Sequence, residues 1–186
     1  MARVLRENHY TGSVPSGKSH YLFFGEAIIV FSIPANKNIA AFLRCKSVWE
    51  LSRLWAPTGH EENLLTRAIS WATREFKLIE PGVDALVSYA DPNAGHLGGV
   101  YRAASWLYLG QCEEARAYRR RLDGAIAARR AFHSGKRGLK KAEIEALGYE
   151  QLMLPGKFRF ARGLTKKARK ALAHRQQELL THKDRK

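Results

Sequence analysis

The first half of the chain consists of short apolar runs broken by turn residues, a pattern typical of β-strands. The runs HYLFFG and EAIIVFSIP are rich in Ile, Val and Phe, are separated by Gly25 and end at Pro34, so they predict a hairpin. Residues 47–55, SVWELSRLW, predict a further strand that ends before Pro57. Residues 1–19 are rich in Gly, Pro and Ser around HYTGSVPSGKS, which predicts a loop.

A helical spacing of apolar residues follows this strand and predicts a helix over residues 61–79. Thr58 and Glu61 form a capping-box pattern at its start. Its apolar positions are Leu64, Leu65, Ala68, Ile69, Ala72 and Phe76. After Pro81 and Gly82, the segment DALVSY predicts a strand, residues 99–104 a short helix and WLYLG a last strand.

Beyond Gly110 the pattern predicts helices over residues 113–132, 140–147 and 165–180. We therefore expect an α+β fold, in which a mixed, mostly antiparallel sheet is flanked by helices. Residues 1–110 would form the core, and residues 111–186 would form a basic, mainly helical extension for nucleic-acid binding.

Positive charge is concentrated in this predicted extension. The chain holds 32 Lys and Arg against 17 Asp and Glu, a net charge of +15. Residues 1–110 hold 11 basic and 9 acidic residues, whereas residues 111–186 hold 21 and 8. Such an asymmetry indicates a polyanionic partner, either nucleic acid or an anionic membrane surface.

Aromatic residues alternate with basic ones in AYRRRL and GKFRFARGL, which suits phosphate pairing and base stacking better than a lipid surface. A solvated basic face explains any single cluster equally well, but the summed excess favours nucleic acid. The candidates for nucleic-acid binding are Arg119, Arg120, Arg121, Lys157, Phe158, Arg159, Lys166 and Lys167.

No apolar run reaches the length of a membrane span, and the N-terminal MARVLRENHY lacks the apolar core of a signal peptide. We therefore expect a protein of the cytoplasm. Cys45 and Cys112 lack metal-type spacing and are expected to be reduced, packed or idle thiols.

Arg53 is the first candidate for chemistry. Strand alternation places Trp49, Leu51, Arg53 and Trp55 on one face of residues 47–55. A guanidinium on this apolar face needs a partner or lines a cleft, because an unpaired buried charge is costly. A structural ion pair or a stacked arginine is the alternative.

The stretch SYADPNAGHLGGVY carries a second candidate pair. Pro92 keeps Asp91 extended at the carboxyl end of a strand, where ligands collect. Tyr101 falls in the first turn of the next helix, with its hydroxyl facing the gap. A carboxylate and a phenol across a gap suit proton removal from a nucleophile and proton delivery to a leaving group. The alternative is an Asx-type turn capped by Asp91, with Tyr101 packed in the core.

Two further segments carry weaker signals. The turn APTGHEEN would point backbone amides at the space above a helix N-terminus, which suits phosphate, but Glu61 and Glu62 would repel an anion. His9 and Tyr10 lie in the predicted loop, where Tyr10 can stack on a base and His9 can titrate or bind a metal. Helix capping and an ordinary exposed pair are the respective alternatives.

The order of these segments resembles the Mom family of DNA-modification proteins from Mu-like bacteriophages, a divergent branch of the GNAT acyltransferase fold. This resemblance rests on the segments VWELSRLWAP, ENLLTRAISWATREF and ALVSYADPNAGHLGGVYRAASWLYLG. It covers about residues 8–110, and the tail matches the family only by its basic character. The resemblance implies a GNAT-like sheet and the conversion of adenine in phage DNA to N6-(carbamoylmethyl)adenine, which protects the genome from host restriction enzymes.

The resemblance also implies site residues. Tyr101 falls where GNAT enzymes often hold their general acid, and a pyrophosphate-binding turn would span residues 58–63. The catalytic candidates are His9, Tyr10, Arg53, Asp91 and Tyr101, and the cofactor-binding candidates are Thr58, Gly59, His60, Asn63, Gly98 and Gly99.

The donor and the partners stay open at this point. Because APTGHEEN departs from the glycine-rich loop of the wider superfamily, the acyl donor is either acetyl-CoA or an aminoacyl-tRNA, whose glycyl group would supply two carbons and the nitrogen. Iron could bind through His9. The implied partners are double-stranded DNA, a donor tRNA and a second copy of the chain in a homodimer.

Two other functions stay open. An ordinary GNAT acetyltransferase acting on a protein, an RNA or a small amine would bind CoA without needing DNA, and the basic tail argues against it. A noncatalytic nucleic-acid-binding protein would use Asp91 and Tyr101 only structurally. A carboxylate and an arginine at strand ends favour the enzyme.

Overall fold

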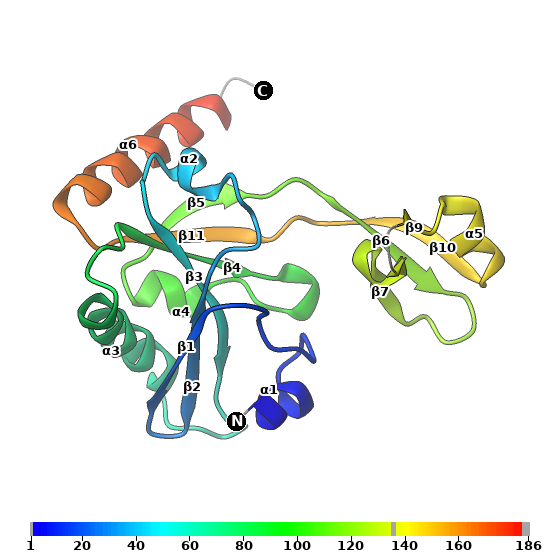
Figure 1. The fold of residues 1–186 in the computed structure, drawn as a ribbon, viewed down its shortest axis with the longest axis horizontal. Helices are drawn as coiled ribbons and strands as arrows, with labels where there is room; N and C mark the ends of the chain where they lie inside the picture. Colours follow the sequence, from blue (N-terminus) through cyan, green and yellow to red (C-terminus); the bar gives the residue numbers. More distant parts are fainter. Residues whose placement is uncertain (1, 135–136, 184–186) are drawn as a thin grey trace. The chain divides into compact units, whose positions relative to one another are not determined.

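The fold is described from a computed structural model, for residues 2–134 and 137–183. The chain divides into two compact units (Figure 1). Unit 1 comprises Met1–Gln111 and Phe158–Lys186, and unit 2 comprises Cys112–Lys157. The chain therefore leaves unit 1, forms unit 2 and returns to complete unit 1.

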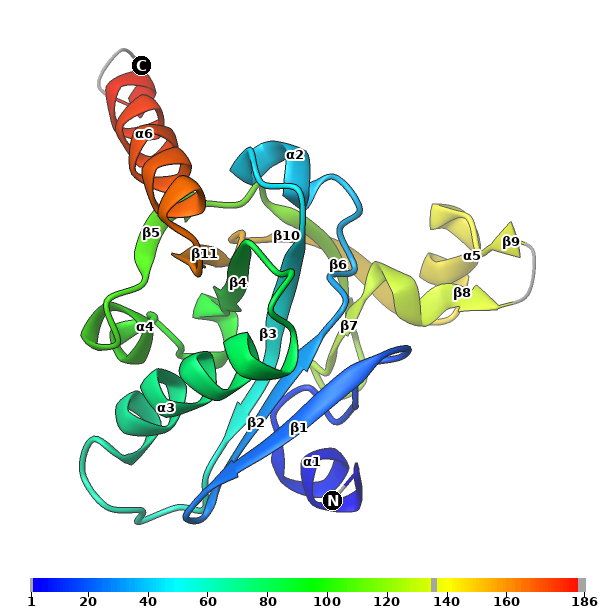
Figure 2. The same cartoon turned by 60° about the vertical axis from the view of Figure 1, so that its left-hand side comes forward.

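In the described part of the chain, six strands form the central sheet of unit 1, in the order β1-β2-β3-β4-β11-β5 (Figure 2). Neighbouring strands are antiparallel except for the parallel pair β3 and β4. The strands are β1 Ser19–Phe24, β2 Ala27–Ser32, β3 Val48–Trp55, β4 Ala85–Ala90, β5 Leu107–Gln111 and β11 Phe158–Gly163. This arrangement confirms the predicted mixed, mostly antiparallel sheet.

Helices cover both faces of this sheet. On one face, α3 buries Ala68, Ile69 and Phe76 against Phe31 and Leu86 of the strands. On the other face, α2 and α6 pack on β4 and β5, and α1 packs on β2. Burial of each large apolar side chain, such as Ile69 or Phe76, contributes about 1.5–3 kcal/mol to the free energy of unfolding. The helices are α1 Ala2–Asn8, α2 Ile39–Leu43, α3 Leu64–Ile79, α4 Gly99–Ala103 and α6 Lys166–Lys183, with a 3-10 turn η1 Pro92–Ala94.

Two predictions for the first unit are wrong. Residues 2–8 form the helix α1 rather than a loop, because Leu5 is fully buried against Ile28 and Val30 of β2. The helix predicted over residues 61–79 is α3, which begins at Leu64 rather than at residue 61. Asn63 has a left-handed φ of 60°, which ends the preceding turn, and Thr58 is exposed rather than capping the helix.

The division predicted after residue 110 needs a correction as well. The segment KFRFARG was assigned to the basic extension, but β11 inserts between β4 and β5, and Phe160 and Ala161 are fully buried. The helix predicted over residues 165–180 is present as α6, and it packs on the sheet through Ala168 and Leu172. Residues 158–183 therefore belong to the core unit.

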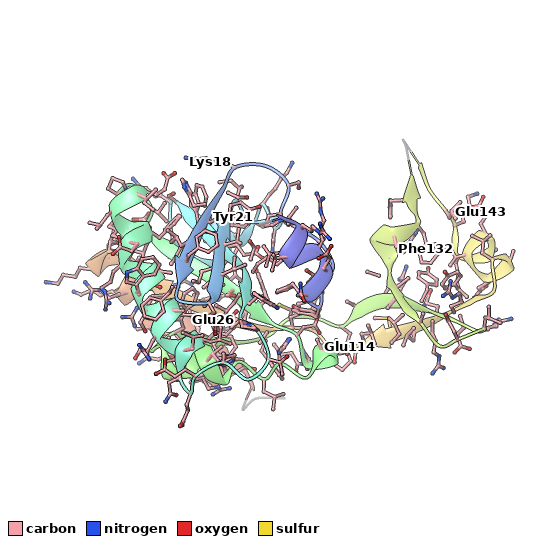
Figure 3. The ribbon with its side chains drawn as sticks, turned by 90° about the horizontal axis from the view of Figure 1, so that it is seen from below. Lys18, Tyr21, Glu26, Glu114, Phe132 and Glu143 are labelled. Atoms are coloured by element: carbon pink, nitrogen blue, oxygen red, sulfur yellow. The ribbon has the colours of Figure 1, made fainter. Side chains whose placement is uncertain are left out.

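Unit 2 contains a three-stranded antiparallel sheet in the order β10-β6-β7. Its elements are β6 Ala115–Arg120, β7 Ile126–Ala128, η2 Arg129–Phe132, β8 His133–Ser134, β9 Arg137–Gly138, α5 Lys141–Ala146 and β10 Tyr149–Leu154. Tyr118 is buried, and its ring lies 5.2 Å from that of Phe132, which Figure 3 labels among the side chains of this unit. The helix predicted over residues 140–147 is confirmed as α5.

The helix predicted over residues 113–132 is wrong. Asp123 and Gly124 form a tight turn between β6 and β7, in which Gly124 has a φ of 73° and the Asp123 carboxylate accepts the backbone N–H of Ala125 at 3.0 Å. An Asp-Gly pair between two short runs is a hairpin signal. This local signal outweighs the helix-forming alanines and arginines around it.

None of the helices among the described residues is long and apolar enough to cross a membrane.

Gly98 provides a test of how β11 packs against α4. A Cβ atom at Gly98 would lie 2.2 Å from Cε2 of Phe160, and the residue has a φ of +80°. Gly98→Ala should therefore lower the free energy of unfolding by about 2–4 kcal/mol through overpacking and backbone strain. Urea denaturation measures this change.

The control is Gly99→Ala, because a Cβ atom there meets no atom within 4 Å among the described residues. This variant should be as stable as the wild type, since alanine favours a helix more than glycine does. Equal stability of the two variants would contradict the packing of Phe160 on Gly98.

Candidate active site

The candidate site lies where β3 and β4 stop pairing. Among the described residues these two strands pair at Val48–Ala85, Trp49–Leu86 and Glu50–Val87, and the register ends there. At the next position the Ser88 hydroxyl, rather than a backbone amide, donates to the Leu51 carbonyl at 2.7 Å. The strands thus diverge at the centre of the sheet, which leaves a place for side chains from the surrounding loops.

A β-bulge in β3 changes the face on which Arg53 lies. Val30 pairs with Arg53 but Phe31 pairs with Leu51, so Ser52 is an extra residue in β3. Leu51 therefore packs with the core under α3, whereas Arg53 lies opposite Val30, whose side chain packs with α1. The predicted shared face of Trp49, Leu51, Arg53 and Trp55 is wrong, because the bulge reverses the alternation.

Arg53 holds the segment that follows α1. Its Nε donates to the Ser13 carbonyl at 2.8 Å, and one terminal nitrogen bonds the Ser13 hydroxyl at 3.0 Å. The other terminal nitrogen donates to the Ser52 carbonyl at 2.6 Å. A planar fork with several donors suits this task better than a lysine would. The arginine thereby fixes the position of His9 and Tyr10, which precede Ser13 on the same segment.

His9 and Tyr10 form an aromatic row with His96. The Tyr10 ring lies 4.6 Å from that of His9 and 4.9 Å from that of His96. His9 is buried, and its Nδ1 accepts the backbone N–H of Thr11 at 3.2 Å, so the ring proton of the neutral imidazole lies on Nε2. Tyr10 is 48% exposed. The N-terminal segment thus meets the loop after β4 through a tyrosine that solvent can reach.

Asp91 caps the turn that carries His96. Its Oδ1 accepts the backbone N–H and the side-chain amide of Asn93, both at 3.0 Å. Its carbonyl accepts the backbone N–H of His96 at 3.0 Å. This is the Asx-type turn that the sequence left open as an alternative. Asp91 therefore shapes the turn, and the turn brings His96 to Tyr10.

Tyr101 is buried at the point of divergence, 7% exposed, rather than facing an open gap. Its hydroxyl lies 2.8 Å from that of Ser88, and the ring stacks on Phe160 at 5.2 Å. Since the single proton of Ser88 goes to the Leu51 carbonyl, the Tyr101 hydroxyl donates to Ser88. Burial raises the pKa of Tyr101 to about 12, and the nearby Tyr10 and Glu50 add to this rise. Ser88 opposes the rise, because its hydroxyl can turn to donate to the ionised phenol.

The five catalytic candidates are thus placed in one region, from three separate parts of the chain. Tyr10 and Tyr101 are close enough to interact electrostatically, Arg53 anchors the segment of His9 and Tyr10, and Asp91 shapes the turn of His96. Sequence reasoning missed Ser88 and His96. Ser88 shares a strand with Tyr89, and His96 stands between the glycines of NAGHLGG, but neither pattern singles out a site residue.

The cofactor candidates occupy two turns. Thr58 and Gly59 are exposed in the turn before α3, and the His60 Nδ1 bonds the Glu61 carbonyl at 2.9 Å. Gly98 is buried under Phe160, which explains its glycine without a cofactor, whereas Gly99 is exposed. A cofactor role for Thr58, Gly59, His60, Asn63 and Gly98 with Gly99 stays a prediction.

Iron binding through His9 gains no support. No group of three or more His, Cys, Asp or Glu side chains that could hold a metal occurs among the described residues. The His9 Nδ1 is already engaged by Thr11. A stable iron site needs several such ligands together, so the donor set does not fit the metal.

The nucleic-acid candidates differ in their surroundings. Phe158 packs with the core and Arg159 stacks on Phe42 at 4.1 Å, because the two alternate across β11. The alternation of aromatic and basic residues in GKFRFARGL is thus that of a core strand and not of a stacking surface. In unit 2, Arg119 pairs with Glu150 and Arg120 with Asp123. Arg121, Lys157, Lys166 and Lys167 are exposed.

Arg53→Lys tests the anchoring of the N-terminal segment. Lysine keeps the charge but cannot make the three bonds of the guanidinium to Ser13 and Ser52. Amide hydrogen exchange over residues 10–14 should become about tenfold faster or more. The reason is that hydrogen bonds to a charged group contribute about 1.5–3 kcal/mol, and this free energy would no longer oppose local opening. Arg74→Lys, on the exposed side of α3, is the control. Unchanged exchange in Arg53→Lys would contradict the anchoring role.

Tyr101→Phe should remove part of the loss of stability at high pH. The phenol ionises near pH 10 in the unfolded chain, but its pKa is about 12 in the folded protein. The resulting contribution to the free energy of unfolding is fully present below pH 10 and is lost as the pH rises from about 10 to about 12.

Urea unfolding at pH 8 and at pH 11 measures this contribution as the difference between wild type and variant. Tyr21→Phe, at a half-buried tyrosine of β1, serves as control. If Tyr101→Phe lost stability with pH as steeply as the wild type, the buried phenol would not be the cause.

Comparison with known proteins gives the family. A model described as the Mom protein family matches residues 1–179. The methylcarbamoylase mom of Escherichia phage Mu is 31% identical over 125 residues, which cover 66% of this chain and 51% of that protein, so the chain spans about half the length of this relative. An acetyltransferase of Bacillus subtilis, crystallised in complex with CoA, aligns with a TM-score of 0.44 and 9% identity over 88% of this chain and 84% of that chain. Because the family model covers nearly the whole sequence, the chain belongs to the Mom protein family.

Proposed function

We propose that the protein modifies adenine in phage DNA, converting it to N6-(carbamoylmethyl)adenine and so protecting the DNA from host restriction enzymes. The observation that carries this proposal is the family match over residues 1–179, together with the related methylcarbamoylase of phage Mu. The net charge of +15 supports a polyanionic substrate.

The substrate atom sets the demands on the site. The lone pair of adenine N6 is delocalised into the ring, so the nitrogen is a weak nucleophile, and it lies inside the duplex. An enzyme that acts on it must extrude the base and offset an unstacking cost of a few kcal/mol. Phosphate contacts by exposed cations such as Lys166 and Lys167 can offset part of this cost.

Tyr10 is the proposed stacking partner of the extruded base. Its ring is half exposed, and contacts with His9 and His96 hold it in place. A ring already fixed on both sides loses little conformational freedom when a base stacks on it. The anchoring of this segment by Arg53 supports the same role, so we assign Arg53 as a positioning residue.

Proton transfer involves the turn that begins at Asp91. In the reaction a bond forms between N6 and the incoming carbon while the bond between that carbon and the leaving group of the donor breaks, and N6 loses one proton. Asp91 is proposed to accept this proton, and the exposed imidazole of His96, on the same turn, to pass it to solvent, since an imidazole has both a proton acceptor and a proton donor. Tyr101 stays protonated at neutral pH, which suits a proton donor to the leaving group.

Mass spectrometry of nucleosides tests the function. Plasmid DNA from bacteria that express the wild type should contain an adenosine species about 57 Da heavier than the unmodified nucleoside. This is the mass added when a carbamoylmethyl group replaces one hydrogen on N6 of an extruded base. Acetyl transfer would instead add about 42 Da, so the mass separates the two donors, and a glycyl amide of equal mass is distinguished because it alone has a free amine. Unmodified DNA from a folded wild type would contradict the proposal.

Two substitutions at Asp91 separate its roles. Asp91→Asn keeps an oxygen that can accept the Asn93 N–H but cannot accept a proton, whereas Asp91→Ala loses both functions. Both variants should abolish the modification of adenine while leaving nonspecific DNA binding unchanged. His96→Gln should lower the amount of modified adenine. If Asp91→Asn modified DNA as well as the wild type, Asp91 would only shape the turn.

A further inference from the structure

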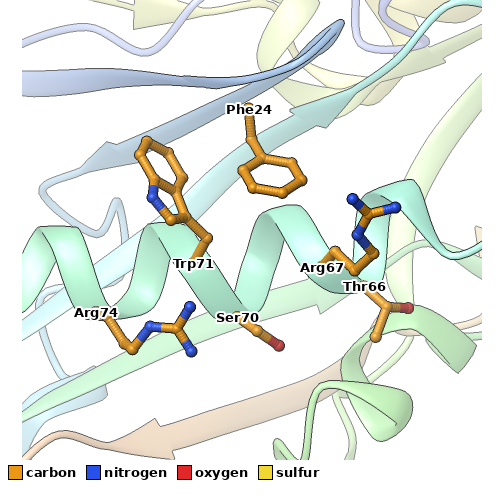
Figure 4. Close-up of a pocket in the computed structure, with 6 residues that line it drawn as sticks. All are labelled: Phe24, Thr66, Arg67, Ser70, Trp71 and Arg74. Atoms are coloured by element: carbon orange, nitrogen blue, oxygen red, sulfur yellow. The ribbon is translucent and has the colours of Figure 1, made fainter.

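The outer side of α3 carries a cationic groove that the proposed chemistry does not use. Its lining residues are Phe24, Thr66, Arg67, Ser70, Trp71 and Arg74, and its volume is about 340 Å³. Figure 4 shows Trp71 beside Phe24 on one side of the helix and Ser70 with Thr66 on the other. None of these six described residues is acidic.

The spacing along α3 brings the two arginines to one surface. Ser70 stands three residues after Arg67, and Arg74 stands four residues after Ser70. This spacing places all three residues on one side of the helix, with the two arginines seven residues apart. Seven residues rise about 10.5 Å along the helix axis, close to the roughly 10 Å that four successive phosphates of one DNA strand span along the duplex axis. The backbone positions of the two arginines are thus spaced so that each cation can meet a phosphate of the same strand.

The side chains of the groove are free to take up an anion. Arg74 makes no hydrogen bond or ion pair among the described residues. Arg67 pairs with Glu61 at 2.8 Å, but both side chains are more than half exposed, and such a pair contributes little and exchanges readily. The hydroxyls of Thr66 and Ser70 also line the groove and can donate hydrogen bonds to an anion.

An aromatic wall completes the groove. The rings of Phe24 and Trp71 lie 5.6 Å apart, and the Arg67 guanidinium lies 5.6 Å from the Phe24 ring. Cations beside aromatic rings are typical of surfaces that follow a nucleic-acid strand, where rings contact sugars or unpaired bases. An acidic peptide would use the cations but has no need of such a wall.

We infer that this α3 groove is a second DNA contact, which holds the phosphate backbone of one strand on the outer side of α3. The same helix packs against α4, the short helix that holds Tyr101. The inference rests on the proposed function for its substrate. Holding the backbone at a second place would keep the duplex in register while a base is extruded, which requires contacts on the flanking nucleotides.

The test is the salt dependence of DNA binding, measured by fluorescence anisotropy with a labelled duplex. Arg67→Ala with Arg74→Ala removes two phosphate contacts, so the slope of log Kobs against log salt should become less steep by about 1.8, and binding near 0.1 M salt should weaken about tenfold or more. Because both positions are exposed on α3, the variant should unfold at the wild-type temperature.

The matched control is Lys37→Ala with Lys46→Ala, which removes the same charge from exposed positions on either side of α2, on the opposite face of the sheet. It should leave the slope unchanged. An unchanged slope in the arginine variant, or an equal change in the control, would overturn the inference. An acidic-peptide site would give the first of these results.

The same samples keep the two proposals apart. A wild type that modifies DNA, with an arginine variant that binds DNA like the wild type, would overturn the groove and leave the proposed function standing. A wild type that leaves adenine unmodified, with an arginine variant that shows the reduced slope, would overturn the proposed function and support the groove as a DNA contact.

Discussion

One buried hydroxyl group allows the central sheet to open. Beyond Glu50 and Val87 the strands β3 and β4 no longer pair, and the Leu51 carbonyl would lose its hydrogen bond in the interior. An unsatisfied buried carbonyl costs about 1–3 kcal/mol. Ser88, 1% exposed, supplies the missing donor and accepts the Tyr101 hydroxyl in turn. The pairing of β3 and β4 thus stops at the centre of the sheet, and the candidate site lies at this point.

The site depends on packing between distant segments. Leu5 holds α1 on β2, Arg53 holds the following segment on β3, and Asp91 shapes the turn after β4. The row from His9 through Tyr10 to His96 joins two of the segments that these contacts hold. A site built in this way is sensitive to substitutions that touch no substrate.

Most strands of the first unit could be predicted from sequence, because runs such as EAIIVFSIP are β-rich, apolar and bounded by glycine or proline. The errors came from effects that are not local. The bulge at Ser52 reversed the face of Arg53, and burial of Leu5 turned a polar segment into α1. The basic residues of β11 concealed a core strand, because one face of that strand meets the stacked side chain of Phe42 instead of solvent. The sequence brought attention to Asp91 and Tyr101, but not to Ser88, whose importance follows only from the strand divergence.

The position of β11 has a consequence for biosynthesis. This strand lies between β4 and β5, yet it follows all of unit 2 along the chain. While the ribosome adds the residues of unit 2, β4 and β5 therefore wait without the neighbour that separates them, and their exposed edges can pair with other chains. The earlier unit 2 closes on itself, the sooner the two ends of the insertion are brought together, at Cys112 and Lys157, where a backbone hydrogen bond of 2.8 Å joins them. A nascent chain halted before residue 158 would therefore lack the strand between β4 and β5 and would expose their edges.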